Sequence, residues 1–264
     1  MRGTSEEVFV RAFEACLYRT PAWADGVFFS EVDTGEGVPD LILVRIVGMT
    51  KHEVAQLLNT LPADPFLNGT GAVLAELHRR PHSLNYLAQH TGLTREYVRR
   101  AVYFLCRLGW ATQTDRGLFV ASCERVLPDF EITAFEFKMK DAGRAVQQAI
   151  RYRQFAHKAI VILPPQRQAS VDAVSELAYK ATLGIATFDA TSCAVRFSIR
   201  PRTKSPRSRH AYMHVLGRLI LHIEVGDHSS QRRFPKQSGA KGESARFGSS
   251  VQKGLPYGQC TYCR

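Results

Sequence analysis

Residues 131–163 read EITAFEFKMKDAGRAVQQAIRYRQFAHKAIVIL, and this stretch decides the fold class. Its first part alternates apolar and polar side chains, as expected of a half-buried strand over 131–140. Asp141 then stands where a helix N-cap is expected, and the helix extends to Ala156. The run KAIVIL at 158–163 is apolar throughout, which is typical of a strand buried on both faces of a sheet. This order predicts an α/β fold with a mixed sheet flanked by helices.

The segments on either side continue the alternation of helices and strands. An amphipathic helix capped by Ser5 is expected first, and two short strands follow it across a DTGEG turn. A helix and two further strands are expected downstream of KAIVIL. The expected elements are a helix over 5–18, strands over 27–31 and 38–47, a short helix over 51–60, a helix over 171–183, strands over 185–189 and 194–199, and a last helix or strand over 210–222.

The sequence between the second and third strands has a different character. After a Pro- and Gly-rich linker at 61–71, three helices and a β-hairpin are expected, ending near residue 122. Ser83 and Thr94 are the expected N-caps of the second and third helices, and a DRG turn joins the two hairpin strands. This order of elements, over about 68–122, resembles the winged helix-turn-helix family.

In that family the third helix enters the major groove of DNA and the wing touches the backbone. The resemblance therefore implies DNA contacts by Arg95, Arg99 and Arg100 on the third helix and by Arg116 on the wing. Many winged helices bind proteins or only pack against a neighbouring domain. Both alternatives remain open from the sequence.

The positive charge of the chain is concentrated near its C-terminal end. The formal net charge is +11, and residues 196–264 contain 14 Lys and Arg against three acids. The first 195 residues hold 21 bases and 21 acids, so they are neutral as a whole. A basic polar tail over 226–264 indicates either a polyanionic partner, most often nucleic acid, or a disordered segment that keeps the protein soluble.

Cysteine usage and hydropathy bear on the cellular setting. A CxxC pair at the C-terminus leaves a zinc site open, although no further ligands stand at a recognisable spacing. No apolar run reaches the length of a membrane span, and the start MRGTSEEVFV lacks a signal-peptide pattern. A soluble cytoplasmic protein with no membrane partner is therefore expected. Four cysteines lie in apolar surroundings where free buried thiols are common, namely Cys16, Cys106, Cys123 and Cys193.

A second set of residues carries chemistry once the 61–122 segment is set aside. Asp40, preceded by a proline, opens the second strand, and Glu136 and Lys138 follow on the third strand as Glu-Phe-Lys. This arrangement resembles the PD-(D/E)XK nuclease superfamily, which includes restriction endonucleases and Holliday-junction resolvases. The next helix adds Gln148 and Tyr152, which match the QxxxY pattern of the RecB-like branch.

The resemblance implies a restriction-endonuclease-like fold and hydrolysis of DNA, or of RNA, with Mg²⁺ or Mn²⁺ as cofactor. Asp40, Glu136 and the carbonyl of Phe137 would bind the metal, because Mg²⁺ prefers hard oxygen ligands. Lys138 would orient the attacking water or stabilise developing charge. Divalent metal chemistry suits this reaction, since it neutralises the phosphate and supplies hydroxide at neutral pH.

Other residues would support that site in the resembled superfamily. Gln148 and Tyr152 lie one helical turn apart and would help to position the nucleic acid. Many members add an acid from the first helix, and Glu7 is preferred here because the start of that helix would overhang the site. Glu14 and Glu31 are the alternatives.

Plainer interpretations of the same residues remain. Glu136 and Lys138 could form a solvent-facing ion pair that contributes little, and Gln148 and Tyr152 could belong to an ordinary helix surface. The rival functional hypothesis is a non-catalytic DNA-binding protein, either a regulator or a scaffold. A nuclease with one site per chain would favour a homodimer or a partner subunit for cutting both strands.

The sequence therefore predicts three parts. An α/β domain is built from two separate segments, 1–60 and 123–225. The winged-helix segment 61–122 is inserted between them, and a basic flexible tail follows over 226–264.

Overall fold

The protein was analysed as a computed structural model, which describes residues 6–17, 23–123 and 127–226. Almost all of the expected tail, with its CxxC pair, lies outside these residues. The helices are α1 Glu6–Leu17, α2 Lys51–Thr60, η1 Asp64–Phe66, α3 Asn68–Leu77, α4 Leu84–Thr91, α5 Arg95–Arg107, α6 Ala142–Tyr152, η2 Pro165–Arg167, α7 Gln168–Lys180 and α8 Arg209–Gly226. The strands are β1 Val27–Ser30, β2 Leu41–Arg45, β3 Ala111–Gln113, β4 Phe119–Ala121, β5 Glu131–Phe137, β6 Lys158–Leu163, β7 Gly184–Asp189 and β8 Ala194–Ile199.

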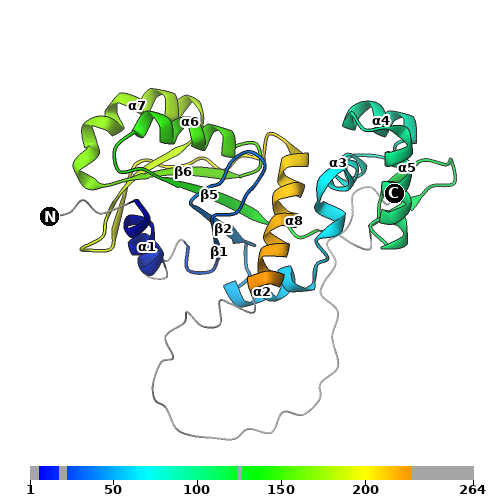
Figure 1. Cartoon of the computed structure of the whole chain (residues 1–264), viewed down its shortest axis with the longest axis horizontal. Coiled ribbons are helices and arrows are strands. Elements are labelled where there is room, and N and C mark those ends of the chain that lie inside the picture. The colour runs from blue at the N-terminus through cyan, green and yellow to red at the C-terminus, as the bar shows by residue number, and fades with distance from the viewer. Residues whose placement is uncertain (1–5, 18–22, 124–126, 227–264) are drawn as a thin grey trace, which may run out of the picture.

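Six of the strands form one mixed sheet in the order β1-β2-β5-β6-β7-β8. The three strands β5, β6 and β7 are parallel, while β1, β2 and β8 pair antiparallel at the two edges. Helices α6 and α7 cover one face and α1 covers the other (Figure 1). The α/β class with a mixed sheet flanked by helices is thus confirmed.

Side-chain alternation along β5 assigns residues to the two faces of the sheet. Phe135 and Phe137 lie under α1, where the ring centroid of Phe13 is 4.8 Å from that of Phe137. Ala134 and Glu136 point to the opposite face, which α6 covers. β6 is buried on both faces, as its apolar run predicts. The expected strand over 131–140 ends earlier, at Phe137.

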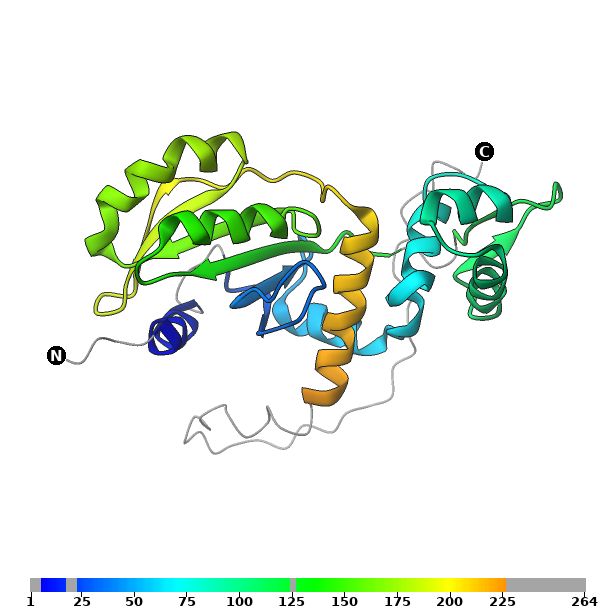
Figure 2. The same cartoon turned by 45° about the horizontal axis from the view of Figure 1, so that its top comes forward.

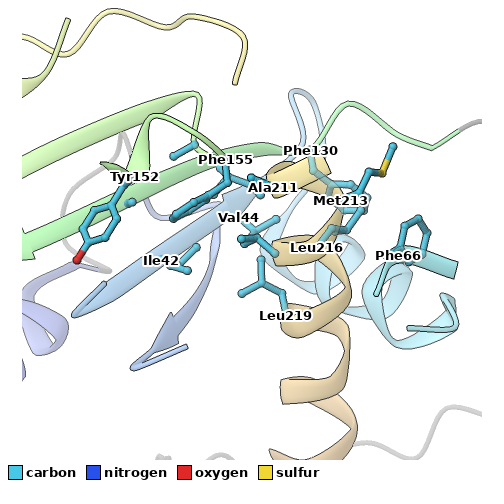
Figure 3. Close-up of a cluster of buried hydrophobic side chains, with 14 of the residues drawn as sticks. Ile42, Val44, Phe66, Phe130, Tyr152, Phe155, Ala211, Met213, Leu216 and Leu219 are labelled. Atoms are coloured by element: carbon cyan, nitrogen blue, oxygen red, sulfur yellow. The ribbon is translucent and has the colours of Figure 1, made fainter. Parts of the chain in front are cut away.

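Helix α8 joins the sheet to the segment that follows β2. It lies between the sheet and α3 (Figure 2). Figure 3 shows Leu219 on the side of Val44 and Met213 on the side of Phe66. A helix that packs on two sides has apolar residues around most of its circumference. For this reason residues 210–222, left open between helix and strand from the sequence, form a helix.

Close packing against α8 depends on Gly217. A Cβ atom at that position would lie 2.8 Å from Cδ2 of Leu67 and 3.0 Å from Cβ of Phe66. The absence of a side chain therefore lets the η1 region approach the helix. One apolar core runs from the sheet through α8 into α3. The segment 61–122 and the α/β part consequently share their core.

The helices and hairpin expected between β2 and β5 are observed. The N-cap oxygens of Ser83 and Thr94 each accept a backbone hydrogen bond at 3.2 Å, from Tyr86 N and Tyr97 N. His82 also bridges to β4 through two backbone bonds of 2.8 Å with Phe119. The caps fix the starts of α4 and α5, and the His82 bridge joins the segment before α4 to the hairpin.

The cysteines differ from the expectation of free buried thiols. Cys16 of α1 and Cys193, in the turn between β7 and β8, form a disulfide with a Cα–Cα distance of 5.5 Å. Cys123 is exposed and Cys106 is half-buried, and both are free thiols. The sequence prediction was wrong for the first pair because 177 residues separate the two cysteines. None of the described helices is long and apolar enough to span a bilayer.

Candidate active site

Asp40 and Glu136 are brought together by the pairing of β2 with β5. The register places Leu41 opposite Phe135, so the preceding Asp40 stands beside Glu136. Its Oδ2 atom accepts a hydrogen bond of 2.7 Å from the backbone N–H of Phe137. Two residues that are far apart in the sequence therefore meet at one end of the sheet.

Glu136 is a buried carboxylate with two side-chain partners. Only 1% of its side chain is exposed. Oε2 accepts a hydrogen bond of 2.7 Å from the Tyr152 hydroxyl, which points away from α8 in Figure 3. Oε1 lies 3.0 Å from Nζ of Lys138. The interpretation of Glu136 and Lys138 as a solvent-facing pair is therefore wrong.

Lys138 is held by a third group as well. Its ammonium donates to Oε1 of Glu6 at 2.7 Å and to the carbonyl of Phe137 at 3.0 Å. Burial alone would lower the pKa of Lys138, but the bonds to Glu6 and Glu136 outweigh it and raise the pKa above its usual value. The side chain is therefore a protonated ammonium at neutral pH.

The acid that α1 contributes is Glu6, whereas Glu7 was expected. Glu6 lies three residues before Phe9 and seven before Phe13, so it shares their face toward the sheet. Glu7 lies on the outer face, where it pairs with Arg11 at 2.5 Å and is exposed. The i, i+3, i+7 spacing from Glu6 to the buried phenylalanines was the signal that sequence reasoning overlooked.

The environment raises the pKa values of Asp40 and Tyr152, the two acids that neighbour Glu136. Burial and the charge of Glu136 raise the pKa of Asp40 to about 6, although the Phe137 N–H bond opposes the shift. Burial and Glu136 also raise the pKa of Tyr152, so its hydroxyl stays protonated and donates. Acids whose pKa values are shifted in this way are common at functional sites.

Two hollows open beside this cluster. One has a volume of about 390 Å³ and is lined by Glu6, Lys138, Lys140, Arg144 and Gln148. Within it, Oε1 of Gln148 is buried and has no hydrogen-bond partner among the described residues. A buried acceptor of this kind suits a site that takes up a water molecule or a ligand.

The second hollow, of about 450 Å³, lies on the other side of Glu6. It is acidic, because Asp40 and four glutamates from α1 and from the end of β1 line it. The glutamates are Glu6, Glu7, Glu14 and Glu31. Glu7, Glu14 and Glu31 thus lie on the rim of the cluster, and Glu6 is the one that contacts Lys138.

The residues present fit a hard divalent cation by their chemistry. Asp40, Glu136 and the carbonyl of Phe137 are oxygen donors, and Mg²⁺ sites in proteins use one or two carboxylates with further oxygens. In the described part of the chain, no three His, Cys, Asp or Glu side chains gather closely enough to hold a metal. A metal here would therefore depend on two carboxylates and the backbone carbonyl.

The arginines expected to touch DNA are exposed but lie elsewhere. Arg95, Arg99 and Arg100 are on α5 and Arg116 is in the hairpin turn, at the opposite end of the molecule from α1 (Figure 1). Glu96 pairs with Arg99 at 2.9 Å and with Arg100 at 3.5 Å. Part of the positive charge of α5 is thus neutralised within the helix itself.

No family model, curated protein or solved structure matches this chain. Neither the PD-(D/E)XK resemblance nor the winged-helix resemblance is supported or contradicted by such a match.

Proposed function

We propose that this protein is a metal-dependent nuclease that hydrolyses phosphodiester bonds of DNA at the cluster of Asp40, Glu136 and Lys138. One observation carries the proposal. Asp40, which is far from Glu136 and Lys138 in the sequence, meets them at one end of the sheet, where Glu136 is buried and Lys138 lies 3.0 Å from it. Gln148 and Tyr152, the other residues of the resemblance, border the same cluster.

Asp40, Glu136 and the carbonyl of Phe137 would hold Mg²⁺ or Mn²⁺. When bound, the ion would supply positive charge beside the phosphate oxygens and make a water molecule more acidic. Asp40 must be ionised for this role, and with a pKa of about 6 it is largely ionised at pH 7 and above.

The remaining residues would position and stabilise. Lys138, as an ammonium, would orient the attacking water and stabilise the negative charge that develops on the phosphate. Its raised pKa argues against a role as the base that accepts the proton of that water. Tyr152 would hold Glu136 in place, and Glu6 would hold Lys138. Such supporting bonds keep reactive groups in a productive geometry.

The DNA would also contact the segment between β2 and β5. Its three helices and hairpin would act as a winged helix, with Arg95 and Arg116 free of the Glu96 pairs that engage Arg99 and Arg100. The exposed bases Lys140 and Arg144, at the mouth of the hollow beside Lys138, would meet the phosphates next to the cleaved bond.

A second candidate is a non-catalytic DNA-binding protein that retains a nuclease-like site. The observation in its favour is the position of Lys138. Its Nζ atom lies within 3.0 Å of both Oε1 of Glu136 and the carbonyl of Phe137, two of the three proposed metal ligands. The ammonium could then replace a metal permanently, and the cluster would be a structural ion pair.

Cleavage separates the two candidates. Supercoiled plasmid and linear DNA are incubated with the wild type in Mg²⁺, in Mn²⁺ and in EDTA. Cleavage is expected with either metal and not in EDTA. Asp40→Asn and Lys138→Met should each lower the rate at least about a hundredfold, as removal of a charge-stabilising group does.

Lys158→Met is the matched control. Lys158 has 18% of its side chain exposed against 17% for Lys138, and it also pairs with a glutamate, Glu131, at 2.9 Å. It lies at the other end of the sheet, so its loss should leave cleavage unchanged. A wild type that cuts no DNA, or that cuts as fast after Lys138→Met, would eliminate the nuclease proposal.

A further inference from the structure

The segment from the end of β8 to the first residue of α8, which we call the basic strap (residues 200–209), is a strongly positive surface. It carries Arg200, Arg202, Lys204, Arg207 and Arg209, and all five side chains are exposed. The chain contains no Asp or Glu between residues 190 and 223. Part of the basic excess that the sequence places after residue 196 thus lies on a defined surface.

Backbone bonds hold the strap against the connection from α6 to β6. The N–H groups of Lys204, Arg207 and Ser208 donate to carbonyls of that connection at 3.1, 3.0 and 2.9 Å. Beneath it, the buried guanidinium of Arg153 donates to the carbonyls of Ala156 and Lys204. Because these bonds already hold the strap in place, its backbone would lose little conformational freedom when the strap binds a ligand.

The buried Arg153 adds positive charge under the strap. Only 2% of the residue is exposed, and it forms no ion pair with another described residue. Burial lowers its pKa, and the charge of Arg207 lowers it further. An anion bound above the strap would offset this uncompensated charge.

The strap forms one wall of a pocket of about 380 Å³, which we call the basic pocket. Arg79 enters it from the end of α3, Arg207 from the strap and Arg209 from the start of α8. Neither Arg207 nor Arg209 forms an ion pair with another described residue. Asp129 is the one acid among the described residues of the lining, and His157 adds a titratable group. The lining therefore favours an anion.

The first turn of α8 strengthens this preference. The helix is 18 residues long and begins at Arg209, and its N-terminal end carries partial positive charge. Guanidinium groups from three segments, beside a helix N-terminus, supply the positive charge and the N–H donors that phosphate oxygens accept.

A polar track connects the basic pocket with the acid cluster. On α6, Arg144, Gln148 and Arg151 share one face because they are spaced at i, i+4 and i+7. Arg144 and Gln148 line the hollow beside Lys138. Arg151 is exposed in the last turn, two residues before Arg153, whose carbonyl accepts a hydrogen bond from the strap. The pocket borders the start of β5, whereas the acid cluster lies at its end.

The length of β5 gives the separation of the two sites. The first and last of its seven residues are six steps of about 3.3 Å apart, roughly 20 Å. With about 3.4 Å of rise per base pair along the helix axis, this length corresponds to about six base pairs along a duplex.

We propose that the basic pocket binds a backbone phosphate of duplex DNA, about six base pairs along the duplex axis from the phosphodiester at the acid cluster. The duplex would lie along the exposed face of α6 between the two sites. The binding of DNA by the pocket can be tested without cleavage, and only the position of the reacting bond rests on the proposed nuclease function.

The test measures affinity in EDTA with a fluorescently labelled DNA duplex of about twenty base pairs, by anisotropy at several salt concentrations. The double variant Arg207→Gln/Arg209→Gln should bind roughly tenfold more weakly at 0.1 M salt. The slope of log K against log salt should fall by about one for each phosphate contact that is lost. Both side chains are exposed, so an unchanged thermal midpoint should show that the variant is folded.

The charge-matched control is Lys51→Gln/Lys180→Gln, whose exposed lysines lie on α2 and α7 and line neither the basic pocket nor the hollow beside Lys138. Its affinity and salt slope should equal those of the wild type. The proposal is overturned if the Arg207→Gln/Arg209→Gln variant behaves as the control does. A titration with inorganic phosphate tests whether the pocket binds a free phosphate ion instead of a DNA phosphate.

The pocket would be assigned to a free anion if the wild type and the control bind phosphate tightly and saturably and the arginine variant does not, while the duplex affinity of the arginine variant is unchanged.

The two proposals fail in different ways. A wild type that binds duplex through the pocket yet cuts no DNA refutes the nuclease and keeps the pocket. A wild type that cuts DNA, with an arginine variant that binds and cuts equally well, refutes the pocket and keeps the nuclease.

Discussion

Replacing Asp40 with asparagine should make the metal-free protein more stable at neutral pH. In the folded protein the pKa of Asp40 is raised to about 6 from an ordinary value of 3.8 by burial and by Glu136. Ionised Asp40 is thus held at a free-energy cost above pH 6. Asparagine cannot ionise, and its side-chain oxygen can still accept the hydrogen bond that Oδ2 receives from Phe137 N at 2.7 Å.

The magnitude follows from the shift of about two pKa units. At 1.36 kcal/mol per unit the cost is about 3 kcal/mol. Asp40 is only partly buried, so solvent screening reduces the expected gain to about 1–2 kcal/mol. The folded state binds the proton more tightly than the unfolded state between pH 3.8 and 6. The contribution of Asp40 to the free energy of unfolding of the wild type therefore falls as the pH rises through that window.

Urea unfolding in EDTA at pH 4 and pH 8 measures the effect. The free energy of unfolding of Asp40→Asn should nearly equal that of the wild type at pH 4 and exceed it by about 1–2 kcal/mol at pH 8. Adding Mg²⁺ or Mn²⁺ at pH 8 should stabilise the wild type, because the metal binds only the folded state. The variant should not respond.

Two outcomes would contradict this prediction. The first is that Asp40→Asn is less stable than the wild type at pH 8. The ionised carboxylate would then stabilise the fold through its contacts and would carry no free-energy cost. If metal stabilises both proteins equally, the ion binds elsewhere.

Three further predictions concern the supports of the site and the core. Tyr152→Phe leaves Oε2 of Glu136 buried without its donor, so the free energy of unfolding should fall by about 1–3 kcal/mol; an unchanged urea midpoint would contradict the buried bond. Gly217→Val places a side chain against the η1 region and should destabilise by about 1–3 kcal/mol, whereas tolerance of valine would mean that α8 is not closely packed there. Reducing the Cys16–Cys193 disulfide should lower the thermal midpoint and the free energy by about 2–4 kcal/mol, and the reductant should have no effect on a Cys16→Ser/Cys193→Ser variant.

The candidate site was only partly predictable from the sequence. Asp40, Glu136 and Lys138 were identified by their order on expected strands, but whether the two carboxylates meet depends on strand register. That register joins residues about a hundred positions apart. A shift of one residue would have turned Glu136 toward α1.

The first helix shows where local pattern was sufficient and where it was misread. Its amphipathic spacing correctly predicts the helix, and it also places Glu7 and Glu14 on one face. The buried face is the one that carries Phe9 and Phe13, so Glu6 is the acid that turns inward. The prediction of Glu7 relied on distance along the helix when the face decided the contact.

The sequence by itself determined the α/β class, the helices and hairpin between β2 and β5, and the residue types of the acid cluster. These depend on periodicity, capping and composition, which act over a few neighbouring residues. Tertiary structure alone decided that Glu136 is buried, that Cys16 meets Cys193 and that α8 packs between the sheet and α3. It also decided that arginines from three segments share one pocket. Such contacts depend on how distant segments pack, and no local pattern encodes that.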